Sequence, residues 1–468
     1  MGIRDRLDER ARAEAERRRR EIERLLAENP GRLTRGCGDA LPGLRTHAAP
    51  RDLVRLMDES ELLDTPQGRV RRWVTRVPVA PDPEAPPHPR GYLFLPRPRA
   101  GGCTPGFLGD ACAVLGIDTP PRTPPAPADL LFLDTETTGM LGATGTVAFL
   151  VGLGWFECAA DAGPDHFVVE QLFIEDFCDE RALLALVADR IARHAALVTY
   201  NGRGYDMPLL EARFVMNRMR PPSPLPHLDL LHAARAVFRG TLESCSLRSV
   251  ERGALGITRT HDVDGGLIPM IFFDYARGTR RERMVPVIDH NVQDIVSLGA
   301  LLLDLGERTA DDAHPRLDDR PVVAAAIGRL LRRRGLEDRA TRFFERAVRD
   351  SRDPNLTRSA LAELARLYRR AGRHDDAAAI WEGEWRRHGL REPQACLELI
   401  KVFERGMRRP DRALAVVADA ERQARLASDL GRIGGGGRDP DTDDLLRELA
   451  KRRERLERRM ASRKPVKD

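Results

Sequence analysis

The sequence lacks the features of a membrane or secreted protein. Its longest nearly apolar stretch, Val147 to Phe156, is far shorter than the roughly 18 to 20 residues that cross a bilayer. The N-terminus is charged from its fourth residue, and it has no apolar segment of the kind that forms a secretion signal. We therefore expect a cytoplasmic protein that does not span a membrane.

Cysteine and lysine are also scarce. The seven cysteines are scattered and have no C-x-x-C spacing, so neither a zinc site nor a disulfide framework is indicated. Only four of the 77 basic residues are lysine, a bias that we attribute to a GC-rich genome. The segment GRGYD lacks the spacing of a phosphate-binding P-loop, which leaves nothing to argue for nucleotide hydrolysis.

The length and the charge pattern predict a globular protein of several parts. At roughly 100 to 200 residues per domain, 468 residues correspond to two to four folded units. Residues 1–128 carry 22 basic against 18 acidic residues, 129–306 carry 16 against 24, and 307–468 carry 39 against 30. The middle part is acidic. Such a surplus repels a polyanion, but it also suits a site that holds divalent cations before it meets phosphates.

The arrangement of apolar runs predicts an α/β domain over 129–306. Residues 1–128 form an N-terminal region, with a charged helix over 1–30, short strands near 70–79 and 92–95, and a Pro-rich linker before 129. From 129 onward, three strand patterns are followed by a helix, a strand and a helix, and then by further helices. This order favours a mixed sheet flanked by helices.

Residues 322–428 predict a set of helical repeats. Ala340, Ala377 and Ala413 recur at intervals of 37 and 36 residues, each between two apolar helical segments. The pattern resembles tetratricopeptide repeats, although their ideal period is 34; the alternative is an ordinary helical bundle. The remaining segment, 429–468, is rich in basic residues, and we expect it to be a flexible tail that forms a frayed, solvated helix, with weak phosphate contact as the alternative.

Two acidic residues stand at the end of the first strand pattern of the α/β region. In LLFLDTETTG, Asp134 and Glu136 are two residues apart, so a strand projects both side chains from one face. Two close carboxylates repel each other, and a cation relieves that repulsion. Thr137 and its neighbours add small polar groups and a turn. The alternative is a plain acidic pair in a loop.

Two further acidic positions come later in the chain. Asp206 opens a helix after a strand that ends at Tyr200 and Asn201, where an N-cap role would also explain it. His290 and Asp294 are four residues apart on an apolar helix and therefore lie on one face. A solvent-facing pair is the common alternative for that spacing.

Other polar residues are better explained by local structure. We expect Asp229 to be a helix N-cap and His232 to face solvent, rather than to form another metal site. His261, Asp262 and Asp264 read as loop residues, because the spacing of an EF-hand is absent.

Taken in order, the three acidic segments resemble a known superfamily. A strand with D-x-E, then YNGRGYDMPLL, then H-x-x-x-D on a late helix is similar to the motifs of the DEDD 3′-5′ exonucleases, which have the ribonuclease H-like fold. His290 stands where the tyrosine branch has Tyr, and the histidine branch places its His five residues before the Asp. With the repeats that follow, the whole chain resembles the YprB-like group of ribonuclease H-like proteins.

The resemblance implies a nuclease that uses two divalent cations, Mg²⁺ or Mn²⁺, to hydrolyse phosphodiester bonds of DNA or RNA. It implies that His290 accepts a proton from the attacking water, that a single-stranded 3′ end binds at the site, and that the repeats bind a protein partner. The alternatives are a catalytically weak nucleic-acid-binding adaptor and a scaffold without nucleic-acid contact. The implied cation ligands are Asp134, Glu136, Asp206 and Asp294, and the implied substrate-binding residues are Thr137, Tyr200 and Asn201.

Overall fold

The computed structural model describes residues 53–80, 95–96, 105–117, 125–139, 145–159, 163–259, 262–310, 321–433 and 440–462. The helix predicted over 1–30, the strand residues 92–94 and most of the Pro-rich linker lie outside these ranges. No helix in the described ranges is both long enough and apolar enough to cross a membrane.

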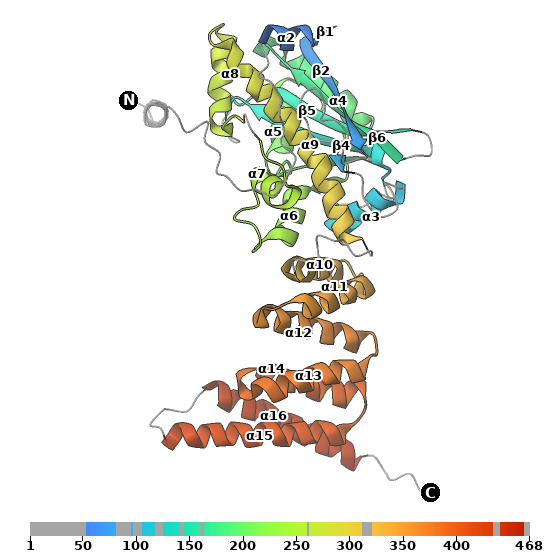
Figure 1. The fold of residues 1–468 in the computed structure, drawn as a ribbon, viewed down its shortest axis with the longest axis vertical. Coiled ribbons are helices and arrows are strands. Elements are labelled where there is room, and N and C mark those ends of the chain that lie inside the picture. The colour runs from blue at the N-terminus through green and yellow to red at the C-terminus, as the bar shows by residue number, and fades with distance from the viewer. Residues whose placement is uncertain are drawn as a thin grey trace. The chain divides into compact units, whose positions relative to one another are not determined.

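The strands form one mixed sheet (Figure 1). Their order is β1-β2-β6-β5-β4-β7-β8, and β3 pairs with β2 off this path. The pairs from β1 to β4 along this order are antiparallel, whereas β4, β7 and β8 run parallel. The strands are β1 (Glu61–Thr65), β2 (Gly68–Ala80), β3 (Leu95–Pro96), β4 (Leu130–Thr137), β5 (Ala148–Ala159), β6 (Gly163–Phe173), β7 (Ala196–Thr199) and β8 (His227–Asp229).

Helices cover both faces of the sheet, because the strands of the middle are apolar on both sides. Phe132 lies in one core with residues of α9, α3 and α6. Its neighbours Leu131 and Leu133 lie in the other core with residues of α4, α5 and α8. Figure 1 shows α9 lying along β4, β5 and β6. These helices are α2 (Leu53–Asp58), α3 (Pro105–Leu115), α4 (Glu180–Ala192), α5 (Asp206–Met216), α6 (Leu230–Phe238), α7 (Leu247–Val250), α8 (Ile268–Ala276) and α9 (Met284–Thr309).

Two glycines of β5 allow α9 to pack closely on the sheet. A Cβ atom added to Gly152 would lie 2.4 Å from Oδ1 of Asn291, and one added to Gly154 would lie 2.6 Å from Cγ2 of Ile295. A side chain at either position would push the helix away. The glycines thus set the distance at which α9 presents its polar residues to the end of β4.

The predicted fold class is confirmed: a mixed sheet flanked by helices is followed by a largely helical region. The boundary at 128 does not separate two sheets, because β2 pairs with β6 over eight residue pairs from Arg71↔Phe173 to Pro78↔His166. The strand near 70–79 is therefore part of the sheet. The short strand β8 was not predicted, since three residues next to several prolines carry no periodic pattern.

The C-terminal region consists of successive helices that pack on their neighbours in the chain. Ala340, Ala377 and Ala413 are all fully buried, as the predicted periodicity requires. Five residues before each alanine, the chain turns through a left-handed residue, namely Gly335, Gly372 and Arg408. The helices are α10 (Pro321–Arg333), α11 (Glu337–Asp350), α12 (Pro354–Arg370), α13 (His374–His388), α14 (Pro393–Lys401), α15 (Pro410–Ile433) and α16 (Pro440–Ala461).

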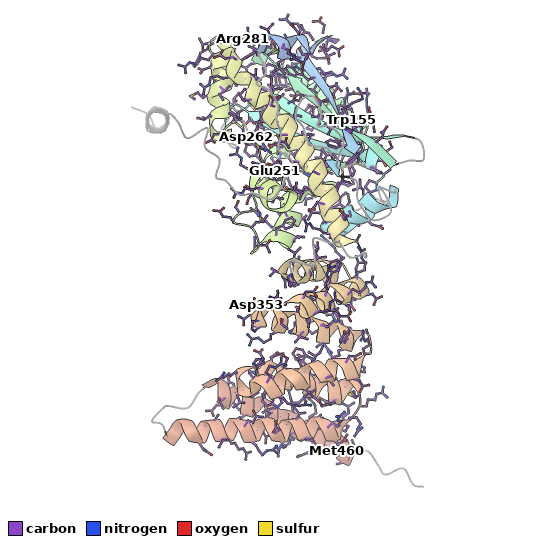
Figure 2. The ribbon with its side chains drawn as sticks, viewed as in Figure 1. Trp155, Glu251, Asp262, Arg281, Asp353 and Met460 are labelled. Atoms are coloured by element: carbon purple, nitrogen blue, oxygen red, sulfur yellow. The ribbon has the colours of Figure 1, made fainter. Side chains whose placement is uncertain are left out.

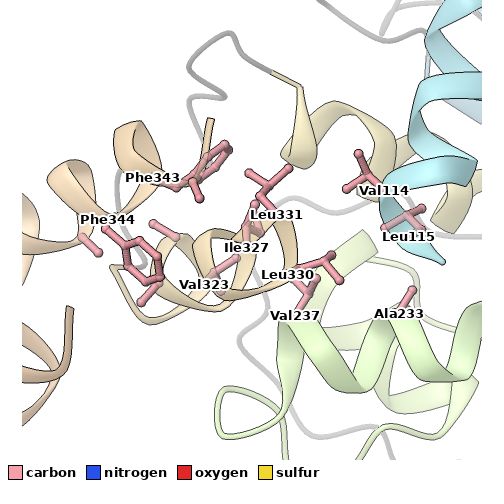
Figure 3. Packing of buried hydrophobic residues seen from close by; sticks show 14 of the residues in the cluster. Val114, Leu115, Ala233, Val237, Val323, Ile327, Leu330, Leu331, Phe343 and Phe344 are labelled. Atoms are coloured by element: carbon pink, nitrogen blue, oxygen red, sulfur yellow. The ribbon is translucent and has the colours of Figure 1, made fainter. Parts of the chain in front are cut away.

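The first of these helices shares a core with the sheet domain. Leu330 and Leu331 of α10 are buried in one apolar cluster with Val114 of α3 and Val237 of α6, and Figure 3 shows these side chains close together. The Arg334 side chain also donates from Nε to the carbonyl oxygen of Val114 at 3.2 Å. The helical region is therefore packed against the sheet domain through α10.

The segment expected to be a flexible basic tail contains a packed helix. Leu445, Leu449 and Leu456 of α16 are buried, and Arg455 donates to the buried Glu404 at 3.0 and 2.7 Å. The expected helix is present, but its apolar face is packed rather than solvated, because the expectation weighed the charge and not the apolar stripe of leucines.

Candidate functional site

Strand β4 places Asp134 and Glu136 on the side of the sheet that α9 covers. Residues alternate between the two faces of a strand, and Phe132 of the same strand belongs to the core that includes α9. The pairing of β4 with β5 shifts register between Glu136 and Thr137, so the strand is irregular where these acids stand. Both predicted acids thus leave the sheet toward the same helix.

Asp206 approaches the same strand from α5. Thr135, which lies between the two acids of β4, donates from Oγ1 to Oδ1 of Asp206 at 2.5 Å. Asp206 is buried at the first position of α5, but no side-chain cap was found for that helix at Tyr205. The side chain of Asp206 therefore contacts β4 and is not the N-cap of α5.

Asp229 anchors the loop that precedes Asp206. Its carboxylate accepts from the backbone N–H groups of Asn201 at 2.8 Å and Arg203 at 3.2 Å. The same side chain accepts from the backbone N–H of Leu231 and is the N-cap of α6. The predicted capping role of Asp229 is confirmed, and His232 is exposed as expected.

Helix α9 supplies His290 and Asp294 on the face toward β4. Nε2 of His290 lies 3.5 Å from Oδ2 of Asp294 and 3.9 Å from Oε1 of Glu136. The ring is mostly buried, with 13% of its side chain exposed. The spacing that predicted a shared helical face for His290 and Asp294 is thus confirmed, and the pair faces the β4 acids instead of open solvent.

Asn291 joins α9 to β4 directly and was not predicted. Its Nδ2 donates to Oδ2 of Asp134 at 3.0 Å, while its Oδ1 accepts from Nε2 of Gln171 at 3.0 Å. Gln171 also donates to the carbonyl oxygen of Ile288 at 2.9 Å. Since the amide oxygen of Asn291 is taken by Gln171, its nitrogen must face Asp134.

Burial and nearby charges shift the pKa values of three of these acids. Burial raises the pKa of Asp134, and the charges of Asp294, Asp206 and Glu136 raise it further. Burial, with the charges of Asp294 and Asp206, raises the pKa of Glu136 to about 8, although the charges of His290 and Arg259 oppose the shift. Burial likewise raises the pKa of Asp206 to about 6, against the hydrogen bond from Thr135. Each carboxylate is therefore costly to ionise beside the others.

His290 is held by an acid that the sequence analysis had set aside as a loop residue. Its Nδ1 donates to Oδ1 of Asp262 at 2.5 Å. Burial lowers the pKa of the His290 ring, but the hydrogen bond to Asp262 and the charges of Asp294 and Glu136 outweigh it and raise the pKa to about 9. Asp262 therefore fixes which ring nitrogen faces the site, and it leaves Nε2 toward Glu136 and Asp294.

Arg259 is a second residue of the site that was not predicted. Its guanidinium group pairs with Asp294 and with Glu251, which is 1% exposed. Glu251 also accepts from Ser297 of α9. Figure 2 labels Glu251 and Asp262 beside α9, in keeping with these contacts. No spacing rule links Arg259 to Asp294, so only the folded chain shows the contact.

The three predicted substrate-binding residues stand at two strand ends: Thr137 is the last residue of β4, and Tyr200 and Asn201 directly follow β7. Thr137 donates from Oγ1 to the carbonyl oxygen of Gly139 at 2.7 Å. Tyr200 donates from its hydroxyl to the carbonyl oxygen of Cys245 at 2.7 Å. Asn201 is exposed and has a left-handed backbone with φ of 65°. Their contact with a substrate remains a prediction.

The donor chemistry of the site fits divalent cations. Carboxylates from β4, α5 and α9 form the kind of oxygen-rich, negatively charged set that Mg²⁺ or Mn²⁺ prefers, and the neighbouring acids raise the pKa of Asp134 and Glu136. In the described ranges, however, no three His, Cys, Asp or Glu side chains are already gathered as a metal-holding group. Three of the carboxylates instead accept from donors within the protein. Asn291 donates to Asp134, Thr135 donates to Asp206, and Arg259 pairs with Asp294.

The chain is similar in sequence to known proteins. Residues 131–305 match a family model described as the RNase_H superfamily. The uncharacterized protein YprB of Bacillus subtilis (strain 168) is 30% identical over 305 residues, which are 64% of this chain and 71% of that protein. A solved family B DNA polymerase from the archaeon Pyrobaculum calidifontis is 13% identical, with a TM-score of 0.31. That match covers 48% of this chain and 30% of the polymerase chain.

Proposed function

Because this chain belongs to the YprB family and carries a ribonuclease H superfamily domain, we propose that it is a metal-dependent nuclease, and specifically a 3′-5′ exonuclease of the DEDD type. The observation that carries the proposal is a set of contacts at the end of β4: His290 faces both Glu136 and Asp294, Asn291 donates to Asp134, and Thr135 donates to Asp206. Buried acids that repel each other are costly to keep unless a cation binds among them.

In this proposal Asp134, Glu136, Asp206 and Asp294 hold two divalent cations, Mg²⁺ or Mn²⁺. When bound, the cations supply the positive charge that lowers the pKa of the attacking water and stabilises the leaving 3′-oxygen. The four carboxylates balance two divalent charges, so a phosphodiester can approach a site that would otherwise repel it. Asn291 and Thr135 orient Asp134 and Asp206 through their hydrogen bonds.

His290 is proposed to accept the proton of the attacking water at Nε2. Asp262 holds Nδ1, so Nε2 is the nitrogen that faces Glu136 and Asp294. The pKa of about 9 arises from the surrounding carboxylates. Neutralising those carboxylates with bound cations lowers the pKa toward the ordinary value near 6.5, at which a histidine serves as a base at neutral pH.

Thr137, Tyr200 and Asn201 are proposed to contact the terminal nucleotide of a single-stranded 3′ end. Asn201 is the best placed of the three, because its side chain is exposed in the loop that precedes Asp206. The hydroxyl of Tyr200 is held by Cys245, which leaves only the ring to stack on a base. The substrate is proposed to be DNA or RNA.

The helical region is proposed to be a set of tetratricopeptide-like repeats that binds a protein partner in the cytoplasm. The left-handed turn five residues before each buried alanine supports a common repeat, because Gly335, Gly372 and Arg408 occupy equivalent places in three helical pairs.

The test uses matched single strands of DNA and RNA, each labelled at either end, incubated with the full-length protein and Mn²⁺ or Mg²⁺. A 3′-5′ exonuclease shortens 5′-labelled strands in single-nucleotide steps and releases a labelled mononucleotide from 3′-labelled strands. Asp134→Ala should abolish both products without lowering the melting temperature. Salt-sensitive binding without any cleavage would instead indicate a nucleic-acid-binding adaptor, and unchanged cleavage by Asp134→Ala would refute the assignment of the site.

A further inference from the structure

The guanidinium group of Arg259 lies among three carboxylates at the edge of the proposed cation site. It donates from Nε to Glu251 at 2.8 Å and pairs through Nη2 with both Glu251 and Asp294. Its Nη1 lies 3.6 Å from Oδ2 of Asp262. Only 9% of the Arg259 side chain is exposed, so these charges interact with little screening by water.

The ion pair between Arg259 and Asp294 occupies a carboxylate oxygen that the proposed function assigns to a cation. Arg259 bonds to Oδ1 of Asp294, while Oδ2 of the same carboxylate faces His290. Asp294 can therefore give a cation its full carboxylate only if it leaves the guanidinium group. A positive charge at this distance also repels an incoming divalent cation.

The position of Arg259 does not depend on Asp294 alone. Glu251 is almost fully buried and accepts two hydrogen bonds from Arg259 and one from Ser297. Ser297 in turn accepts from Gln293 of α9 at 3.0 Å. Arg259 would therefore stay beside α9, held by Glu251, after Asp294 had turned away from it.

From this geometry we infer that Arg259 is a built-in counter-cation, which holds Asp294 in the metal-free protein and competes with a divalent cation for that carboxylate. The inference rests on the proposed metal site and adds a residue that sets the affinity of the site. Competition of this kind stabilises the acids in the absence of metal and weakens metal binding in exchange.

The test compares Mn²⁺ binding to the full-length wild type and to the double variant Glu251→Gln/Arg259→Gln by isothermal titration calorimetry. The double variant removes the guanidinium group without leaving Glu251 as an unpaired buried charge. We expect its Kd for Mn²⁺ to fall by about tenfold. We also expect Mn²⁺ to raise its melting temperature more than that of the wild type, because its metal-free acids have lost their counter-cation.

The matched control is Asp304→Asn/Arg308→Gln, which removes another buried pair on α9 with 5% of each side chain exposed. Asp304 follows Asp294 by ten helical residues, which corresponds to roughly 15 Å along the helix. The Kd of this control variant for Mn²⁺ should therefore match that of the wild type. An unchanged or raised Kd in the Arg259 double variant, with normal circular dichroism, would overturn the inference while leaving the nuclease proposal intact. Absence of Mn²⁺ binding by the wild type and the variant alike would overturn both.

Discussion

Asn291 donates a hydrogen bond from Nδ2 to Oδ2 of Asp134 over 3.0 Å, and this bond links the last helix of the sheet domain to its central strand. Gln171 fixes the direction of the Asn291 amide from a third element, β6. The acid at the end of β4 is therefore oriented by residues of two other elements. Such outer contacts determine how well a carboxylate serves a cation.

Asn291→Leu should lower both Mn²⁺ affinity and hydrolysis by about 10- to 100-fold, as the loss of a residue that orients a ligand usually does. Leucine is branched at Cγ as asparagine is, so the change removes the hydrogen bond and keeps the branched shape, although leucine is larger. Titration calorimetry and a 5′-labelled single strand measure the two effects. Wild-type values for both would show that the orientation of Asp134 does not depend on Asn291.

Gly152→Ala should disturb the site by displacing Asn291, which bonds to Asp134 through its other amide atom. The new methyl group would meet Oδ1 of Asn291 at 2.4 Å, which forces α9 or the amide to move at a cost of about 1 to 3 kcal/mol. We expect a lower melting temperature together with weaker hydrolysis. Gly145→Ala is the matched control, since no atom lies within 4 Å of its added Cβ. Equal stability of the two variants would contradict the close packing of α9 on β5.

Leu331→Ala should destabilise the sheet domain and the helical region together. Leu331 is fully buried in the cluster that joins α10 to α3 and α6, and truncating such a leucine costs about 2 to 5 kcal/mol. Calorimetry should show one transition, shifted to lower temperature as a whole. Leu426→Ala, at a side chain that is 62% exposed, should change little. Two separate transitions, of which only one moves, would show that the regions unfold independently.

The stability of the metal-free protein should fall as the pH rises from 5.5 to 9. The folded pKa of Glu136 is about 8 and that of Asp206 about 6, both above the ordinary values near 4. Folding therefore costs more once these acids must ionise. The raised pKa of His290, about 9, adds stability that is present below 6.5 and is lost as the pH passes 9. The lowered pKa of Asp262, about 2, makes a contribution to stability that changes only at pH values below this range.

Melting temperatures measured across that pH range, in EDTA and in Mn²⁺, test this expectation. The curve in EDTA should fall with pH, whereas Mn²⁺ should flatten it because cations favour the ionised acids. A flat curve in EDTA would mean that the carboxylates do not repel one another in the folded protein.

The sequence predicted the parts of the site that follow local periodicity. Asp134 and Glu136 end an apolar strand, and His290 and Asp294 share a helical face; both relationships depend on spacing alone. Asp206 reaches β4 through Thr135, which lies 71 residues away in the chain. Only the resemblance to a family assigned Asp206 to the site, and the contact with Thr135 was not predicted.

The residues that the sequence analysis missed act through tertiary contacts. Arg259 and Asp262 stand in an irregular segment where no period relates them to α9, and Asp262 was set aside as a loop acid for that reason. Asn291 gains its role from Gly152, whose missing side chain makes room for it. The packing of α16 was missed because the charge of its segment concealed the spacing of three leucines.

The most direct test of the central claim is the rate at which Asp206→Asn shortens a 5′-labelled single strand in Mn²⁺. Asn has nearly the same shape as Asp and can still accept from Thr135, so the fold should be preserved and the melting temperature should not fall. If the four acids act together on bound cations, the rate should drop by at least about 100-fold, as expected when a catalytic electrostatic group is removed. A rate within twofold of the wild type, with normal Mn²⁺ binding, would contradict it.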